Sequence, residues 1–338
     1  MTVTRPPLTP QATVRSPADL IAAVPYLLGF HPSDSVVIVA FRGRRLEFAA
    51  RHDLPTRRER AGSLARHLMT MVARQGLRQL TVICYGTAFA ADPTARAAIA
   101  AAGRRGLTVL DALRVADGRW WSYTCDNPEC CPPEGTPFDP AASAVAAACA
   151  YAGLAPVADR EALAARLAPV TGPARVAMTQ ATDRAGERFL AEFGSLPDDG
   201  DRGRAVLAAG EVAVREAIQR YATGGRLHDD ELAWLSVLLL SIPVRDLAWR
   251  AITAAQPHLD LWHDVTRRCD PELAAAPASL LGFAAWRAGD GALAALALER
   301  ALAEEPSYSM ARLLLDALRQ GVPPSALDGW GGSRDRLT

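Results

Sequence analysis

Residues 35–41 read Ser-Val-Val-Ile-Val-Ala-Phe, and this stretch decides the fold class of the N-terminal half of the chain. An uninterrupted run of β-branched and apolar residues is typical of a strand that is buried on both faces of a sheet. Arg42-Gly43 then predicts a turn, and residues 46–50 predict a returning hairpin strand. This buried hairpin would belong to a sheet with flanking helices.

Helices and further strands surround this hairpin. Ser16 as N-cap and Pro17 at the first helical position predict a helix that ends at Gly29. Further helices are predicted over residues 57–75, 92–105 and 141–152, and further strands over residues 79–85, 107–115 and 119–124. The alternation predicts an α/β domain over residues 16–154, with a mixed sheet, hairpins and flanking helices.

The second half of the chain has a different pattern. From about residue 156 the apolar residues recur with the helical period of 3.6, interrupted by Pro and Gly. The predicted helices cover residues 158–168, 173–193, 203–223, 229–240, 244–254, 257–268, 277–289, 291–304 and 307–319. We therefore expect an all-helical domain over residues 155–328. Residues 1–15 are predicted to be a disordered tail, and residues 329–338 a second tail.

One segment of the helical half has the spacing of a tetratricopeptide unit, whose period is about 34 residues. The matching positions are Leu281-Gly282, Gly289-Asp290, Ala294, Leu298, Ala301 and Pro306. Small residues at positions 282, 294 and 301 would let two antiparallel helices approach closely. The expected fold of this half is therefore all-α and partly tetratricopeptide-like, with a single recognisable repeat.

Composition excludes several classes of function. The 338 residues include 37 basic and 37 acidic side chains, a balance that argues against a broad surface for nucleic acid or anionic membrane. Every basic residue is Arg, so the chain can form no lysine Schiff base and has no Walker A lysine. The N-terminus lacks the apolar core of a signal peptide, and no apolar run approaches the ~20 residues that span a bilayer. These features predict a cytoplasmic protein without a membrane partner.

Three of the six cysteines lie close together in the sequence: Cys125, Cys130 and Cys131. Thiolates are preferred ligands of tetrahedral zinc, so one interpretation is a zinc site with a fourth ligand from Cys84, Asp126, Glu129 or a histidine. A second interpretation is a redox pair formed by Cys125 with one of the other two. The third is a proline-stiffened loop whose small thiols pack under Trp120 and Trp121.

A second group of polar residues lies where the predicted hairpin strands meet. It consists of His31, Asp34 and Ser35 before the first strand and Arg51, His52 and Asp53 at the end of the second. Hairpin pairing would place both blocks at one end of the sheet, and His, Asp and Ser are the residue types of a hydrolytic site. Turn capping by Asp34 and Ser35 and an ion pair between Arg51 and Asp53 explain the same residues. We favour the second explanation.

The usual enzyme signatures are missing from the sequence. It has no nucleophile elbow of the Gly-x-Ser-x-Gly type, no His-Glu-x-x-His motif and no glycine-rich dinucleotide loop. The acidic run that follows His228 begins a predicted helix, where Asp and Glu are favoured by the helix dipole. We interpret that run as a helix start and not as a metal chelate.

The chain resembles an uncharacterised actinobacterial family, domain of unknown function 4192. The resemblance rests on Ser16-Pro17-Ala18-Asp19-Leu20, Val24-Pro25, the block from Leu28 to Val36, the block from Arg51 to Pro55, Tyr123 to Cys125, Cys130-Cys131-Pro132, and Trp286 to Asp290. It extends over nearly the whole chain. The resemblance supports the fold outline and a cytoplasmic setting, and it implies no activity, substrate or cofactor.

Three hypotheses about function follow. The helical repeat and the missing catalytic motifs favour a non-catalytic adaptor or regulatory protein that binds a partner protein through its helical half. The first alternative is a zinc-binding or redox-responsive protein centred on Cys125, Cys130 and Cys131. The second is an enzyme of unrecognised type with its site at the end of the sheet that carries residues 31–35 and 51–53.

Overall fold

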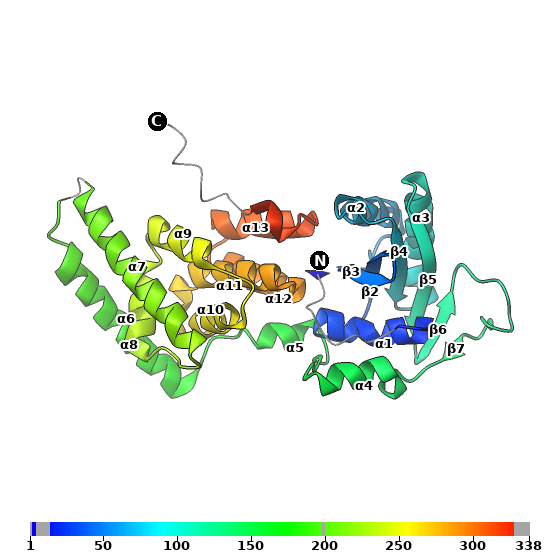
Figure 1. Cartoon of the computed structure of the whole chain (residues 1–338), viewed down its shortest axis with the longest axis horizontal. Coiled ribbons are helices and arrows are strands. Elements are labelled where there is room, and N and C mark those ends of the chain that lie inside the picture. The colour runs from blue at the N-terminus through cyan, green and yellow to red at the C-terminus, as the bar shows by residue number, and fades with distance from the viewer. Residues whose placement is uncertain (1, 5–13, 198–199, 328–338) are drawn as a thin grey trace. The chain divides into compact units, whose positions relative to one another are not determined.

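The computed structural model describes residues 2–4, 14–197 and 200–327 of the chain. They form two compact units, each with its own core. The first unit comprises Met1–Leu163 together with Gly289–Ala292 and Ala317–Pro323, and the second comprises Ala164–Ala288, Leu293–Asp316 and Pro324–Thr338. Figure 1 shows the strands gathered in the first unit and long helices in the second.

The first unit is built on a seven-stranded mixed sheet with the order β1-β3-β2-β4-β5-β6-β7. The strands are β1 (Thr2–Thr4), β2 (Ser35–Arg42), β3 (Arg45–Asp53), β4 (Gln79–Tyr85), β5 (Thr108–Ala116), β6 (Arg119–Ser122) and β7 (Thr136–Pro137). Strand β2 pairs antiparallel with both β3 and β4, and its first six residues are buried. The β-branched run therefore forms a buried interior strand of the sheet, as predicted.

Four helices cover this sheet: α1 (Pro17–Leu28), α2 (Ala61–Arg74), α3 (Ala88–Arg104) and α4 (Ala144–Tyr151). Helices α1 and α4 pack together, as do α2 and α3, and in Figure 1 the strands lie between these two pairs. Ser16 caps α1 by accepting the backbone N–H of Asp19, and Gly29 ends the helix with a φ of 77°. Helix α3 connects the parallel strands β4 and β5.

The second unit is helical, as predicted. It contains all or most of the helices α6 (Gly172–Phe193), α7 (Asp201–Ala222), α8 (Asp229–Leu238), α9 (Ile242–Ala251), α10 (Gln256–Arg268), α11 (Ala275–Ala288), α12 (Gly291–Glu304) and α13 (Ser309–Arg319). Helix α5 (Arg160–Ala165) begins in the first unit and ends in the second. Short 3-10 turns occur at Arg58–Arg60, Pro140–Ala142, Pro271–Leu273 and Pro324–Leu327. Trp262 is fully buried in this unit.

Two predicted boundaries differ from the structure. Thr2–Thr4 forms the edge strand β1 against β3, within the predicted disordered tail of residues 1–15, because Thr and Val favour extended backbone and β3 offers a free edge. The first unit extends to Leu163, beyond the predicted boundary at residue 154. Val157 causes this extension, since its N–H donates to the carbonyl of Gly29 at 2.9 Å and its carbonyl accepts from His31 at 3.1 Å. The predicted tail over 329–338 lies outside the described residues.

In the part of the chain that the structure describes, no single helix is long and apolar enough to cross a membrane. Asp229–Leu238 together with Ile242–Ala251 meets the criteria of length and composition as a pair, but the two helices are bent by 112° at the break between them.

Gly282 allows α11 and α12 to approach closely. A Cβ at this position would lie 2.6 Å from Leu298 Cγ and 3.3 Å from the carbonyl oxygen of Ala294. By contrast, a Cβ on Gly186 in α6 would meet nothing within 4 Å. The two glycines therefore offer a matched test of packing in the helical unit.

We expect Gly282→Ala to lower the free energy of unfolding by about 1–3 kcal/mol, because the added methyl overpacks the α11–α12 contact. Gly186→Ala should raise it by about 0.5–1 kcal/mol, since Ala is the better helix former. Urea unfolding followed by circular dichroism measures both. Equal effects of the two substitutions would show that α11 and α12 do not pack as closely as described.

Candidate functional site

The side chains of Cys125, Cys130 and Cys131 converge at one point of the loop between β6 and β7. The Sγ atoms of Cys125 and Cys130 lie 3.1 Å apart, those of Cys130 and Cys131 lie 3.8 Å apart, and all three lie within 4.8 Å of one another. All three thiols are free, Cys130 is exposed, and the other two are half-buried. We call these residues the thiol cluster. Because its members remain accessible, they do not form the packed core of the loop that the third interpretation required.

A single turn of backbone brings the two parts of the thiol cluster together. The carbonyl of Asn127 accepts the N–H groups of Cys130 at 3.3 Å and Cys131 at 2.9 Å, and its side chain accepts the N–H of Glu129 at 3.0 Å. This turn reverses the chain after Cys125. The two later thiols therefore return to the first one, which the spacing of the cysteines alone does not reveal.

Asp111 on β5 holds the start of the loop. Its Oδ1 accepts hydrogen bonds from Ser122 Oγ at 2.7 Å and Thr124 Oγ1 at 2.8 Å, and it also accepts the N–H of Ala112. Next to this group, Tyr123 donates to Asp92 of α3 at 2.6 Å. The two residues directly before Cys125 are thus both bonded to carboxylates, and the position of the first thiol follows from the sheet.

The other end of the loop is held by β6. The indole N–H of Trp121 donates to the carbonyl of Pro133 at 3.0 Å, and Arg119 donates to the carbonyl of Gly135 at 2.8 Å. Gly135 has a φ of 83°, and a Cβ there would lie 2.4 Å from the ring of Trp121. The guanidinium carbon of Arg114 lies over the same ring, 3.4 Å from the ring centroid. Position 135 therefore requires glycine, because its φ is positive and because a side chain there would clash with the ring of Trp121.

The three thiols differ in acidity. Hydrogen bonds from Cys130 and Cys131 lower the pKa of the Cys125 thiol, and the hydrogen bond to Cys125 raises the pKa of Cys130. Partial burial together with the same hydrogen bonds raises the pKa of Cys131 to about 12. Cys125 is therefore the first of the three to become a thiolate.

None of the proposed fourth ligands joins the thiol cluster. Within residues 2–4, 14–197 and 200–327, no further His, Cys, Asp or Glu places a ligand atom in the group. Cys84 lies on β4 and is fully buried, and this burial raises its pKa to about 12. The arrangement offers three sulfur donors, one fewer than the four ligands of tetrahedral zinc.

The structure brings together part of the second predicted group. Ser35 pairs with Asp53 across the hairpin, so the two blocks lie at one end of the sheet, as expected. Arg51 is 5% exposed and donates to Ser35 Oγ at 2.9 Å, while its other end contacts Asp53 at 2.6 Å. Burial lowers the pKa of the Arg51 guanidinium, and the carboxylate of Asp53 opposes this shift.

The hydroxyl of Ser35 is committed to structure. It donates to the carbonyl of Ser33 and accepts from Arg51, so it has no bond to a base. The ring of His52 bonds to the carbonyl of Asp53 at 2.8 Å, and the side chain of His31 is exposed. Asp34 has a φ of 42° in the turn, and its carbonyl accepts the N–H of Leu54. This geometry matches the turn-and-ion-pair explanation.

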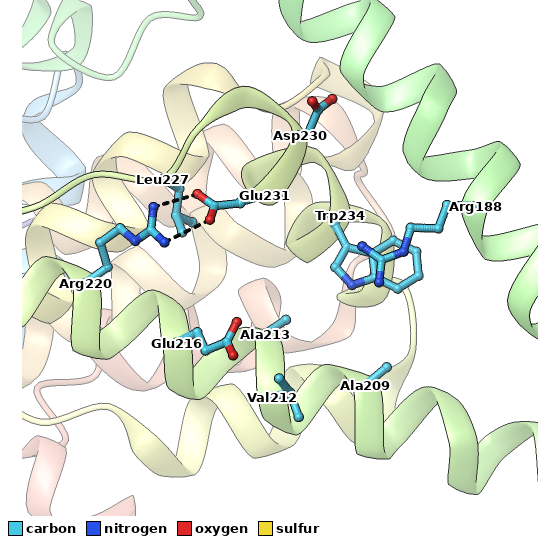
Figure 2. A pocket seen from close by; sticks show the side chains of 10 residues that line it. All are labelled: Arg188, Ala209, Val212, Ala213, Glu216, Arg220, Leu227, Asp230, Glu231 and Trp234. Carbon is cyan, nitrogen blue, oxygen red and sulfur yellow. Dashed lines mark hydrogen bonds and ion pairs between the residues drawn. The ribbon is translucent and has the colours of Figure 1, made fainter.

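The helical unit contains a pocket that sequence reasoning missed. It encloses about 360 Å³ between α6, α7 and α8, and Figure 2 shows its lining. The lining comprises Arg188, Ala209, Val212, Ala213, Glu216, Arg220, Leu227, Asp230, Glu231 and Trp234. Trp234 stacks on Phe193 with ring centroids 6.2 Å apart, and Arg188 lies over its ring at 3.9 Å. These residues come from three helices and, for Leu227, from the connection between α7 and α8, and they have no common sequence motif.

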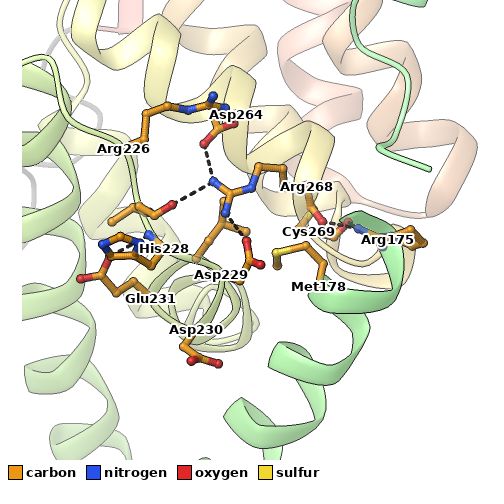
Figure 3. Close-up of polar contacts among 12 residues, drawn as sticks. Arg175, Met178, Arg226, His228, Asp229, Asp230, Glu231, Asp264, Arg268 and Cys269 are labelled. Atoms are coloured by element: carbon orange, nitrogen blue, oxygen red, sulfur yellow. Dashed lines mark hydrogen bonds and ion pairs between the residues drawn. The ribbon is translucent and has the colours of Figure 1, made fainter. Parts of the chain in front are cut away.

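A polar network around Asp264 of α10 connects the helices behind this pocket. Asp264 is 6% exposed and accepts hydrogen bonds from Tyr221, Arg226 and Arg268, the last at 2.8 Å. Figure 3 shows Arg268 extending on to Asp229, at 2.5 Å, and to a backbone carbonyl. Burial by itself would raise the pKa of Asp264, but the hydrogen bonds from Tyr221 and Arg226 and the charge of Arg268 lower it below its ordinary 3.8.

The acidic run after His228 is a helix start, as interpreted. Glu231 accepts the N–H of His228 at 2.8 Å, which completes a capping box at the beginning of α8. Asp229 pairs with Arg268 and Asp230 with Arg184, so each carboxylate has an arginine partner. The run therefore begins α8 and ties it to neighbouring helices through these ion pairs.

We expect Asp264→Asn to lower the free energy of unfolding at pH 7 by about 3 kcal/mol, because it removes the buried carboxylate that pairs with Arg268 and leaves that guanidinium with Asp229 alone. The folded-state pKa of Asp264 lies below the unfolded value, so its stabilisation is complete above about pH 4 and is lost as the pH falls further. Unfolding in urea at pH 7 and pH 3 should show a smaller acid-induced loss in the variant than in the parent. Asp230→Asn removes an exposed pair and should cost less than about 1 kcal/mol. Equal costs for the two substitutions would contradict this assignment.

Comparison with known proteins identifies the family. The model of the family described as Domain of unknown function (DUF4192) matches residues 17–325. No curated protein and no solved structure matches the chain. The match includes both the thiol cluster and the pocket of the helical unit. The chain belongs to the DUF4192 family.

Proposed function

We propose that this protein binds a single zinc ion through the thiol cluster. The observation that carries the proposal is the convergence of three free sulfur atoms within 4.8 Å of one another. Two tetrahedral zinc–sulfur bonds of about 2.3 Å place their sulfur atoms about 3.8 Å apart. The Sγ atoms of Cys130 and Cys131 have this separation, and those of Cys125 and Cys130 need to separate by less than an ångström.

The chemistry of the donors also favours a soft metal. Thiolates select Zn²⁺ and Cu⁺ over Mg²⁺ and Ca²⁺, which prefer oxygen ligands. Binding would remove the protons of all three thiols, so the affinity should fall as the pH is lowered. Free thiols held for a metal suit a reducing compartment, and we accordingly place the protein in the cytoplasm. Water or a group from another molecule would occupy the fourth position of the tetrahedral site.

A second candidate function is partner binding by the helical unit, in a non-catalytic adaptor or regulatory role. The pocket of Figure 2 supports it, because it joins apolar walls, an aromatic ring and charged groups on an accessible surface. The close approach of α11 and α12 at Gly282 fits a tetratricopeptide-like hairpin, a unit that commonly serves protein binding. This function does not depend on the thiol cluster.

We expect the untagged full chain, purified under reducing conditions in metal-free buffer, to contain about one zinc ion per chain. The double variant Cys130→Ser/Cys131→Ser should contain none, because one thiolate does not hold the ion. Elemental analysis by mass spectrometry measures both. Cys149→Ser removes a half-buried cysteine of α4 outside the thiol cluster and should keep its zinc.

Circular dichroism on the double variant verifies that the sheet and helices remain folded. Zinc retained by the folded double variant would place the metal elsewhere. If the parent chain neither carries zinc nor takes it up when Zn²⁺ is added, the proposal is wrong. If the chain carries copper(I) in place of zinc, the thiol cluster is still a metal site and only the identity of the metal is wrong.

A further inference from the structure

The charges of the pocket in the helical unit are paired with one exception. Arg220 holds Glu231 through two contacts of 2.9 Å, and Arg188 holds Glu192 at 2.7 Å. Asp230 is paired with Arg184 at 2.5 Å. No hydrogen bond or ion pair joins Glu216 to any residue that the structure describes.

Glu216 is placed to meet a ligand. It rises from α7 toward α8 beside Ala213 and near the Arg220–Glu231 pair, as Figure 2 shows. Both arginines of the lining are already satisfied by carboxylates, so the unpaired charge of the pocket is negative. A cation therefore complements this pocket better than an anion does.

The size and walls of the pocket limit what this cation can be. Ala209, Val212, Ala213 and Leu227 supply an apolar lining, and the volume of about 360 Å³ is near the lower end of the ~300–1,000 Å³ of ligand pockets. Such a space holds one long side chain and not a helix. Arginine fits it well, because its apolar stem packs on aliphatic groups and its planar head pairs with a carboxylate. Arg188 on Trp234 shows that a guanidinium is already accommodated in this pocket.

We propose that this pocket binds an arginine side chain from an exposed segment of a partner protein, with Glu216 as the carboxylate that receives it. The proposal rests on the second candidate function and names the chemistry of the partner. It is independent of the thiol cluster and of any metal there.

The test uses the full chain labelled with 5-fluorotryptophan, observed by fluorine NMR, with the Trp234 signal assigned through Trp234→Phe. The probes are the peptide acetyl-Gly-Gly-Arg-Gly-Gly-amide and twins with citrulline or lysine in place of arginine. We expect the arginine peptide to shift the Trp234 signal saturably. Citrulline, which keeps the shape and removes the charge, should leave it unshifted, and lysine should bind several-fold more weakly.

Glu216→Gln should weaken binding of the arginine peptide about five-fold or more. Glu211 is an exposed carboxylate on the same helix, and Glu211→Gln should leave binding unchanged. An equal response to citrulline or lysine, or unchanged binding by Glu216→Gln, would overturn the proposal. If other tryptophans of the helical unit shift and Trp234 does not, the arginine site in this pocket is wrong, and the helical unit still binds a partner elsewhere. If no tryptophan shifts saturably, both the arginine site and partner binding by the helical unit are contradicted.

Discussion

The antiparallel pairing of β5 with β6 is the constraint on which the thiol cluster depends. Asp111 on β5 accepts hydrogen bonds from Ser122 and Thr124, which lie at the end of β6 and immediately after it. Cys125 follows directly, so the sheet and not the loop determines where the first thiol lies. Trp121 and Gly135 then close the loop from the other side. A loop held at both ends loses less conformational entropy when its thiols converge on one ion.

In the helical unit, ion pairs hold neighbouring helices together as hydrogen bonds hold the two ends of the cysteine loop. Asp264 accepts from Tyr221 of α7, from Arg226 in the connection between α7 and α8, and from Arg268 of its own helix, and Arg268 continues to Asp229 at the start of α8. Paired charges of this kind cost less to bury than unpaired ones. Glu216, at the edge of the pocket, has no such partner among the residues that the structure describes. It lies at an accessible surface, where an unpaired charge is available for binding.

Much of the fold follows from local sequence signals. The strand predicted over residues 79–85 and the helices predicted in the second half occur with shifts of a few residues at most of their ends, because period and capping are local properties. Helix α3 begins four residues earlier than predicted, at Ala88, since Pro93 is accommodated inside the helix and does not begin it. The edge strand β1 depends on the free edge of β3, which no local pattern reports.

The sites were less predictable for the same reason. The cysteine spacing pointed to the thiol cluster, but Asp111 gave no signal, because its partners belong to another strand. The pocket lining spans α6 to α8, and pairing of its charges becomes visible only in three dimensions. X-ray absorption at the zinc edge of the metal-loaded full chain tests the central claim most directly. The account predicts three sulfur neighbours at about 2.3 Å and one lighter atom. A zinc shell of nitrogen and oxygen alone would contradict it.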